Sequence, residues 1–190
     1  FCPGEDTYLT DSIAEAVIKS TRKAAFDCMK NPDDYTARAN MMWASSLAHN
    51  GLTQCGREFQ LVVHQFEHEL SGMYPKIAHG AGLAALWCSW ARYVYKANIS
   101  RWLQYSANVW NLDIDYEHPE KTIEEAINLQ EQYYVSLGMP IGLKALGVEE
   151  ASLTKLALNC SRNKTRTLTG YKPLAYDDIL AIYQMAYERG

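Results

Sequence analysis

The sequence predicts an all-α fold, because it divides into helix-length segments and shows no alternation of apolar and polar residues typical of strands. Within most segments the apolar residues recur at helical spacing, and Pro, Gly or Asn residues separate one segment from the next. An apolar content of 48% is ordinary for a globular protein and is sufficient for a buried core. No internal repeat is visible. We therefore expect roughly eight or nine helices.

The first two helices are delimited by capping residues and by a proline. The first is predicted to start at a cap formed by Asp11 or Ser12 and to end near Met29. Asn31-Pro-Asp-Asp34 ends that helix and provides the N-terminal signals of a second one. The second helix is expected to run to about Leu52, where Gly51 weakens it.

The middle of the chain predicts a pair of helices joined by an irregular stretch. A third helix is expected from about Glu58 to Ser71, and Pro75 interrupts the residues that follow. The fourth, from Gly80 to about Lys96, is apolar on nearly every face, which predicts a central and buried position. The remaining helices are expected over residues 100–109, 119–137, 151–160 and 178–188, with a short helical turn at 143–147 and Asp177 as the cap of the last helix.

Charge and cysteine content exclude several classes of partner. The net charge of −4 and the pI of about 5.7, without a basic stripe, argue against a nucleic acid or an anionic membrane as partner. No apolar run approaches the roughly 18 residues of a membrane span. The five cysteines are odd in number and lack CxxC spacing, which predicts free thiols and a cytoplasmic protein.

Three of the five histidines lie close together in the sequence. His64 and His68 are four residues apart, so they share one face of a helix. His79 follows after the irregular stretch, beside Gly80 at a helix start. Imidazole is the commonest metal ligand in proteins and titrates near neutral pH. If the chain performs chemistry, we expect that chemistry at this cluster.

The same stretch also fits the inverted zinc-protease pattern H-x-x-E-H, with Glu67 between the two histidines. In that interpretation Glu67 is the general base beside a zinc-bound water. A third ligand is then required, usually a downstream glutamate. Glu124 or Glu125 could serve, but nothing in the sequence singles out either of them.

The histidine stretch resembles the iron-containing alcohol dehydrogenase family, in its butanol dehydrogenase and aldehyde reductase branch. The residues that carry the resemblance are His64-x-x-x-His68-Glu-Leu-Ser-Gly and Ile77-Ala-His79-Gly-Ala-Gly-Leu-Ala. Further similar stretches cover essentially the whole chain; they are Asn31-Pro-Asp-Asp-Tyr, residues 42–51, Gln104-Tyr, Leu137-Gly-Met-Pro and residues 173–183. The loop near Pro75 carries one residue more than is usual in the family.

The resemblance implies a specific fold and a specific metal site. The expected fold is the multi-helix C-terminal domain of the dehydroquinate synthase-like, iron-containing alcohol dehydrogenase fold, with residues 1–190 as one helical metal-binding domain. His64 and His79 are the implied metal ligands, and His68 is the implied catalytic neighbour. Glu67 and Glu69 are expected on the helix surface or behind the ligands. The implied metal is divalent, with iron expected first and zinc as the alternative.

The resemblance also implies what lies outside this chain. Family members have an N-terminal nucleotide-binding domain, which is absent here, and an Asp and a His, four apart, that supply two more ligands. That helix would end just before Phe1. The implied function is interconversion of primary alcohols and aldehydes by hydride transfer with NAD or NADP, with the isolated chain inactive. The face left uncovered could support a homodimer. A non-catalytic helical module that keeps the fold is the alternative.

Overall fold

The structure is a computed structural model, which describes residues 7–58 and 60–189. In these ranges it contains α-helices and short 3-10 helices but no β-strand. The β-structure in these ranges is an isolated antiparallel bridge between Leu168 and Leu174. The predicted all-α fold is thereby confirmed. The α-helices are α1 (Tyr8–Lys30), α2 (Tyr35–His49), α3 (Val62–Met73), α4 (His79–Val94), α5 (Ile99–Trp110), α6 (Pro119–Ser136), α7 (Leu153–Cys160) and α8 (Tyr176–Glu188).

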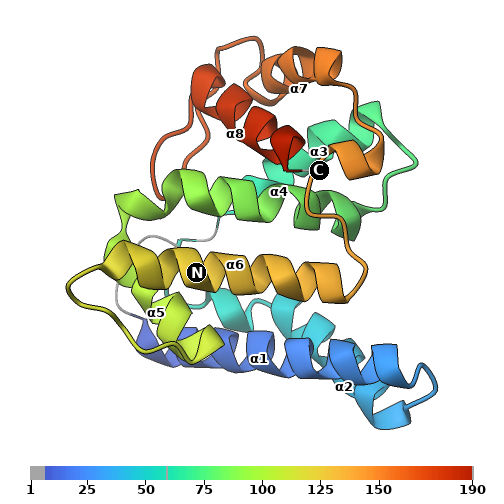
Figure 1. The fold of residues 1–190 in the computed structure, drawn as a ribbon, viewed down its shortest axis with the longest axis vertical. Coiled ribbons are helices and arrows are strands. Elements are labelled where there is room, and N and C mark those ends of the chain that lie inside the picture. The colour runs from blue at the N-terminus through green and yellow to red at the C-terminus, as the bar shows by residue number, and fades with distance from the viewer. Residues whose placement is uncertain (1–6, 59, 190) are drawn as a thin grey trace.

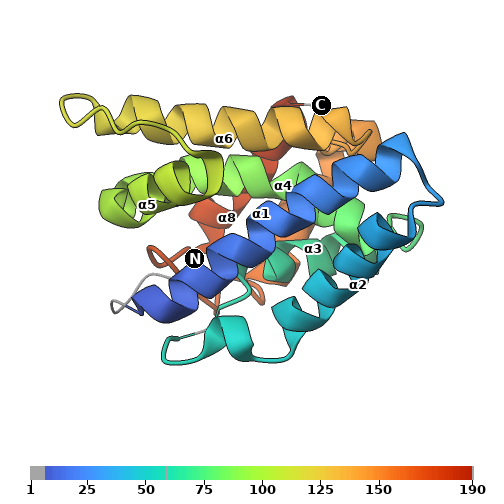
Figure 2. The ribbon, with the colours of Figure 1, turned by 90° about the horizontal axis from the view of Figure 1, so that it is seen from below.

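The helices form stacked pairs around α4 (Figure 1). The α1–α2 hairpin lies at one end, α6 crosses the middle beside α4, and α7 with α8 forms the other end. Viewed from below, α1 crosses the molecule diagonally with α2 beside it (Figure 2). Helix α4 contacts α3, α6 and α8, and Ala85, Leu86 and Ala91 on it have no exposed surface. The prediction that the fourth helix is central and buried is confirmed.

Helix α3 is held in place by the C-terminal helices. The hydroxyl of Tyr183 on α8 donates a hydrogen bond of 2.7 Å to the carbonyl of Phe66, and the two rings pack at 5.3 Å. The guanidinium of Arg166 donates to Oε1 of Gln65 at 2.6 Å. Phe66 and Leu70 are fully buried. This anchoring fixes the other face of α3, which carries His64 and His68.

The start of α3 differs from the sequence prediction. The helix begins at Val62 rather than near Glu58, and in the described residues of the segment between α2 and α3 the helical structure is limited to a short 3-10 turn, Leu52–Gln54. Gly51 and Gly56 adopt left-handed backbone angles, with φ of +90° and +73°. The first lies just after the end of α2, and the second breaks helical geometry again before α3 begins. Arg57, which follows Gly56, forms an ion pair with the carboxylate of Asp11 on α1. This ion pair holds the segment before α3 against α1.

Asp11 is a buried acceptor instead of the predicted helix cap. Helix α1 begins at Tyr8, so Asp11 lies in its first turn, where it pairs with Arg57 and Arg101 and accepts from Gln104. Burial acts to raise the pKa of Asp11, but the hydrogen bonds of Arg101 and Gln104 and the two cationic charges outweigh it and lower the pKa to about 2. The cluster ties α1 to α5 and to the segment before α3.

The start of the last helix, α8, also differs from the prediction, because Ala175 occupies the N-cap position. Asp178, not Asp177, accepts a hydrogen bond of 3.0 Å from the backbone N–H of Ala175.

In the part of the chain that the structure describes, no helix is both long enough and apolar enough to cross a membrane.

Replacing Asp11 by Asn should lower the free energy of unfolding at neutral pH by about 3 kcal/mol, because two buried guanidinium groups lose their counter-charge. The folded-state pKa of about 2 lies below the ordinary 3.8, so this stabilisation is present above about pH 4 and is lost as the pH falls toward 2. Urea unfolding at pH 7 and pH 3 measures both effects.

Between pH 7 and pH 3, the free energy of unfolding of the Asp11→Asn variant should therefore fall by less than that of the parent chain. Asp33→Asn is the control, because Asp33 is exposed and its substitution should change stability by less than about 0.5 kcal/mol. Equal stability of the Asp11→Asn variant and the parent at pH 7 would contradict the role given to the cluster.

Candidate metal centre

The structure brings the three predicted histidines together. His64 and His68 share one face of α3, and His79 is the first residue of α4, after the connection over residues 74–78. The ring centres are 5.2 Å apart for His64 and His79, 5.9 Å for His68 and His79, and 6.1 Å for His64 and His68. The short α3–α4 turn thus places three imidazoles from two helices at one point.

The separation of His64 and His79 suits a shared metal ion. Two imidazoles bound to one metal at about 2.1 Å, with tetrahedral angles, have ring centres about 5 Å apart. The observed 5.2 Å agrees with that arrangement. Burial lowers the pKa of the half-buried His64, and the neighbouring His79 and His68 lower it further. Both effects favour the neutral imidazole, which is the form that binds metals.

Glu67 fixes the orientation of His79. Its side chain is fully buried, and its carboxylate accepts hydrogen bonds from Nδ1 of His79 and from the hydroxyl of Ser71. Because Nδ1 is engaged, Nε2 of His79 remains to bind a metal. Carboxylates behind a ligand histidine set its tautomer and increase its basicity. Of the two positions expected for Glu67, the structure shows the one behind the candidate ligand His79, and not the helix surface.

Gly82 makes room for the buried carboxylate. A Cβ atom at this position would lie 2.8 Å from Cγ and 2.9 Å from Oε1 of Glu67, which is too close for any real side chain. At Gly80, by contrast, a Cβ would meet no atom within 4 Å. Sequence analysis missed this pair. The available signal was a glycine inside a buried helix, which costs about 1 kcal/mol relative to Ala and often marks a close approach.

His68 occupies the solvent side of the cluster. Its side chain is exposed, and its ring lies nearly parallel to that of His79, at an interplanar angle of 28°. Glu69, the next residue, is half-buried. Of the other two histidines, His49 contacts the carbonyl of Ser45 and is near enough to His64 to contribute to the lowering of the pKa of His64, and His118 lies beside Asp115. No sequence expectation attached a role to them.

The inverted zinc-protease interpretation finds no support in this geometry. Glu67 faces the protein interior, where His79 and Ser71 engage both of its oxygens. Glu124 lies on α6, where it faces Arg92 at 3.7 Å, and Glu125 is exposed on the same helix. Among the described residues, no three His, Cys, Asp or Glu side chains are arranged to hold a metal together. The residues present fit a metal as two imidazole ligands that need further ligands.

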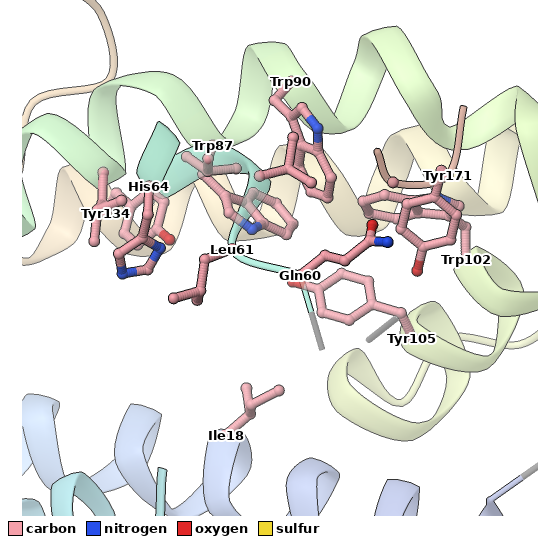
Figure 3. A pocket seen from close by; sticks show the side chains of 14 residues that line it. Ile18, Gln60, Leu61, His64, Trp87, Trp90, Trp102, Tyr105, Tyr134 and Tyr171 are labelled. Carbon is pink, nitrogen blue, oxygen red and sulfur yellow. The ribbon is translucent and has the colours of Figure 1, made fainter. Parts of the chain in front are cut away.

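A cavity of about 340 Å³ adjoins His64 (Figure 3). Apolar and aromatic side chains from α1, α4 and α5 and from the segment before α3 form most of its wall. Three tryptophans, Trp87, Trp90 and Trp102, line this cavity and also pack in or against the buried core. A small apolar molecule could therefore lie with one end at His64.

The known proteins that are similar to this chain belong to one family. The model of the Fe-containing alcohol dehydrogenase family, C-terminal, matches residues 1–187. The chain is 38% identical over 184 residues to NADH-dependent butanol dehydrogenase A of Clostridium acetobutylicum, covering 96% of this chain and 47% of that protein. It is 28% identical over 185 residues to the NADPH-dependent aldehyde reductase YqhD of Escherichia coli, covering 95% of this chain and 46% of the relative.

Solved structures give the same result for the fold. An NADH-dependent butanol dehydrogenase A from Thermotoga maritima superposes with a TM-score of 0.87 at 29% identity, over 94% of this chain and 46% of that one. The aldehyde reductase YqhD superposes with a TM-score of 0.89 at 26% identity, over 97% and 48%. The chain spans a little under half the length of these relatives. It belongs to the iron-containing alcohol dehydrogenase family, whose C-terminal helical part it matches.

Proposed function

We propose that this chain supplies the metal-binding half of an NAD(P)-dependent alcohol dehydrogenase that interconverts primary alcohols and aldehydes by hydride transfer. The observation that carries the proposal is the pair of imidazoles of His64 and His79, with ring centres 5.2 Å apart and Glu67 hydrogen bonded behind His79. Relatives named as butanol dehydrogenases and an aldehyde reductase support the same reaction class.

His64 and His79 would hold a divalent metal, with iron as the first expectation and zinc as the alternative. Such a metal supplies Lewis acidity toward the substrate oxygen. His64 and His79 orient the site through rings that are fixed by burial and by Glu67. His68 is exposed next to His79, where its imidazole can take up or return the proton of the substrate hydroxyl. His68 is therefore the proposed catalytic residue.

The rest of the enzyme lies outside the residues described here. We infer that residues 1–190 form one helical domain, which works with an N-terminal nucleotide-binding domain that binds NAD or NADP. An Asp and a His from outside this chain complete the ligand set, because two imidazoles leave a metal with open positions. A homodimer and a cytoplasmic location are part of the proposal. The four described cysteines are free thiols, which is compatible with that location.

Replacing His64 or His79 by Ala in the complete protein should lower bound metal at least about tenfold, because each change removes one of few ligands. Elemental analysis after dialysis measures the metal per chain. His118→Ala is the matched control, since His118 is half-exposed beside Asp115, away from the cluster. A His64→Ala protein that retains the parental metal content would refute the assignment.

Glu67→Gln should weaken metal binding about 10- to 100-fold, because a neutral amide holds the His79 ring less firmly and makes it less basic. Glu69→Gln, two residues along the same helix, is the control and should bind metal normally. Gly82→Ala should reproduce the loss by displacing Glu67, whereas Gly80→Ala should not. Competition with a chelator measures each affinity. Equal affinities for Glu67→Gln and Glu69→Gln would contradict the role of Glu67.

The 190-residue chain by itself should not oxidise butanol with NAD or NADP, because the nucleotide site and two metal ligands are expected elsewhere. Following absorbance of the reduced nicotinamide at saturating butanol and added Fe²⁺ or Zn²⁺ tests this expectation. Turnover at a rate comparable to that of the complete enzyme would refute the proposal that the nucleotide site and two metal ligands lie outside this chain.

A further inference from the structure

The hydroxyl of Ser71 is the second partner of the buried carboxylate of Glu67. Ser71 lies four residues after Glu67 on α3, so both side chains project from the same face of the helix. The hydroxyl donates to Oε1 of Glu67, and Nδ1 of His79 donates to Oε2. Among the described residues, Ser71 is the one donor to Oε1. The two oxygens therefore have different partners, one from the same helix and one from α4.

The packing around the carboxylate does not by itself fix the plane of the carboxylate. The last torsion of a glutamate side chain is broad and nearly two-fold, so the group can turn about the Cγ–Cδ bond. On the α4 side, a Cβ at Gly82 would lie 2.9 Å from Oε1 and 3.3 Å from Cδ of Glu67. Gly82 thus admits Oε1 to this position but has no side chain with which to hold it there. The hydroxyl of Ser71 is the group that holds Oε1.

Loss of the Ser71 hydroxyl would leave a charged oxygen without its donor. A hydrogen bond to a charged acceptor is stronger than one between neutral groups, and a buried acceptor that loses its partner incurs the full cost of desolvation. Glu67 is fully buried, so no solvent contact stabilises its charge. The remaining donor is Nδ1 of His79, for which both oxygens then compete. The carboxylate would turn, and the His79 ring that it orients would turn with it.

Resting on the proposed function, we propose that Ser71 is a positioning residue for the metal. By holding Oε1 of Glu67, the hydroxyl directs Oε2 to Nδ1 of His79 and keeps Nε2 of His79 oriented to share a metal with His64. Ser71 itself is not a ligand. Its contribution passes through Glu67 and then through His79, so the contribution disappears when Glu67 is removed.

The first test measures the Zn²⁺ affinity of the complete protein and its Ser71 variants by competition with a chelator. Ser71→Ala should weaken binding about tenfold, at the lower end of the range for residues behind metal ligands. Ser71→Thr keeps the hydroxyl and should restore most of the affinity. Alanine favours helices more than serine does, so a loss in Ser71→Ala does not come from a weakened α3. Ser12→Ala is the control, because the exposed hydroxyl of Ser12 bonds to the carbonyl of Tyr8 on α1.

The second test asks whether Ser71 acts through Glu67. In a Glu67→Ala background, Ser71→Ala should cause little further loss of Zn²⁺ affinity, because the oxygen that the hydroxyl holds is absent. An equal loss in the two backgrounds, or a loss that Ser71→Thr does not restore, would overturn the inference.

An NMR measurement separates this inference from the proposed function. In the metal-free complete protein with isotope-labelled histidine, the Nδ1–H proton of His79 should exchange slowly with water, because a buried carboxylate accepts it. Ser71→Ala should speed this exchange, and Ser71→Thr should not.

Equal exchange or equal Zn²⁺ affinity in Ser71→Ala and the parent would overturn the inference and leave the proposed function intact, since water would then replace the hydroxyl. Faster exchange in Ser71→Ala, together with a His64→Ala protein that keeps its metal, would refute the proposed function. That result would also refute the link from Ser71 to the metal, but not the hold of Ser71 on His79.

Discussion

The hydrogen bond between Glu67 and His79 is the constraint on which the site depends. A fully buried carboxylate is costly unless it is paired, and here the imidazole of His79 and the hydroxyl of Ser71 pair it. The bond joins α3 to the first residue of α4 and leaves Nε2 of His79 without this partner. Gly82 is required on α4, because any side chain there would displace the carboxylate.

The hydrogen bond from His79 to Glu67 can fix the His79 ring only if α3, which carries Glu67, is itself held in place. Its inner face meets that condition, because Tyr183 of α8 holds the carbonyl of Phe66 and Arg166 holds the side chain of Gln65. The outer face then presents His64 at a fixed distance from His79. Sites whose ligands are locked by packing and by hydrogen bonds keep their geometry before the metal arrives. The C-terminal helices thus position the site without contributing a ligand to it.

Much of this fold could be predicted from local sequence. Helical spacing and breakers such as Asn31-Pro32 indicated the helices, and the uniformly apolar fourth segment indicated the central one. The spacing of His64 and His68 predicted their shared face. What local patterns could not give were contacts between distant segments. Asp11 looks like a helix cap but pairs with Arg57 and Arg101.

The same limit applies to the candidate site. Glu67 looks like a surface residue because charge is usually exposed, and only the position of His79 on the next helix explains its burial. The aromatic cavity was likewise hidden, since a tryptophan that lines a space has the same sequence spacing as one that fills a core. Both features depend on how α3, α4 and α5 meet, which no single segment encodes.

The central claim is that His64 and His79 together bind a divalent metal, with His79 using Nε2. Anomalous diffraction from crystals of the complete protein, soaked in Fe²⁺ or Zn²⁺, tests it most directly. One strong peak is expected about 2.0–2.2 Å from a nitrogen of His64 and from Nε2 of His79, with Nδ1 of His79 still hydrogen bonded to Glu67. A peak elsewhere, or a metal bound through Nδ1 of His79, would contradict it.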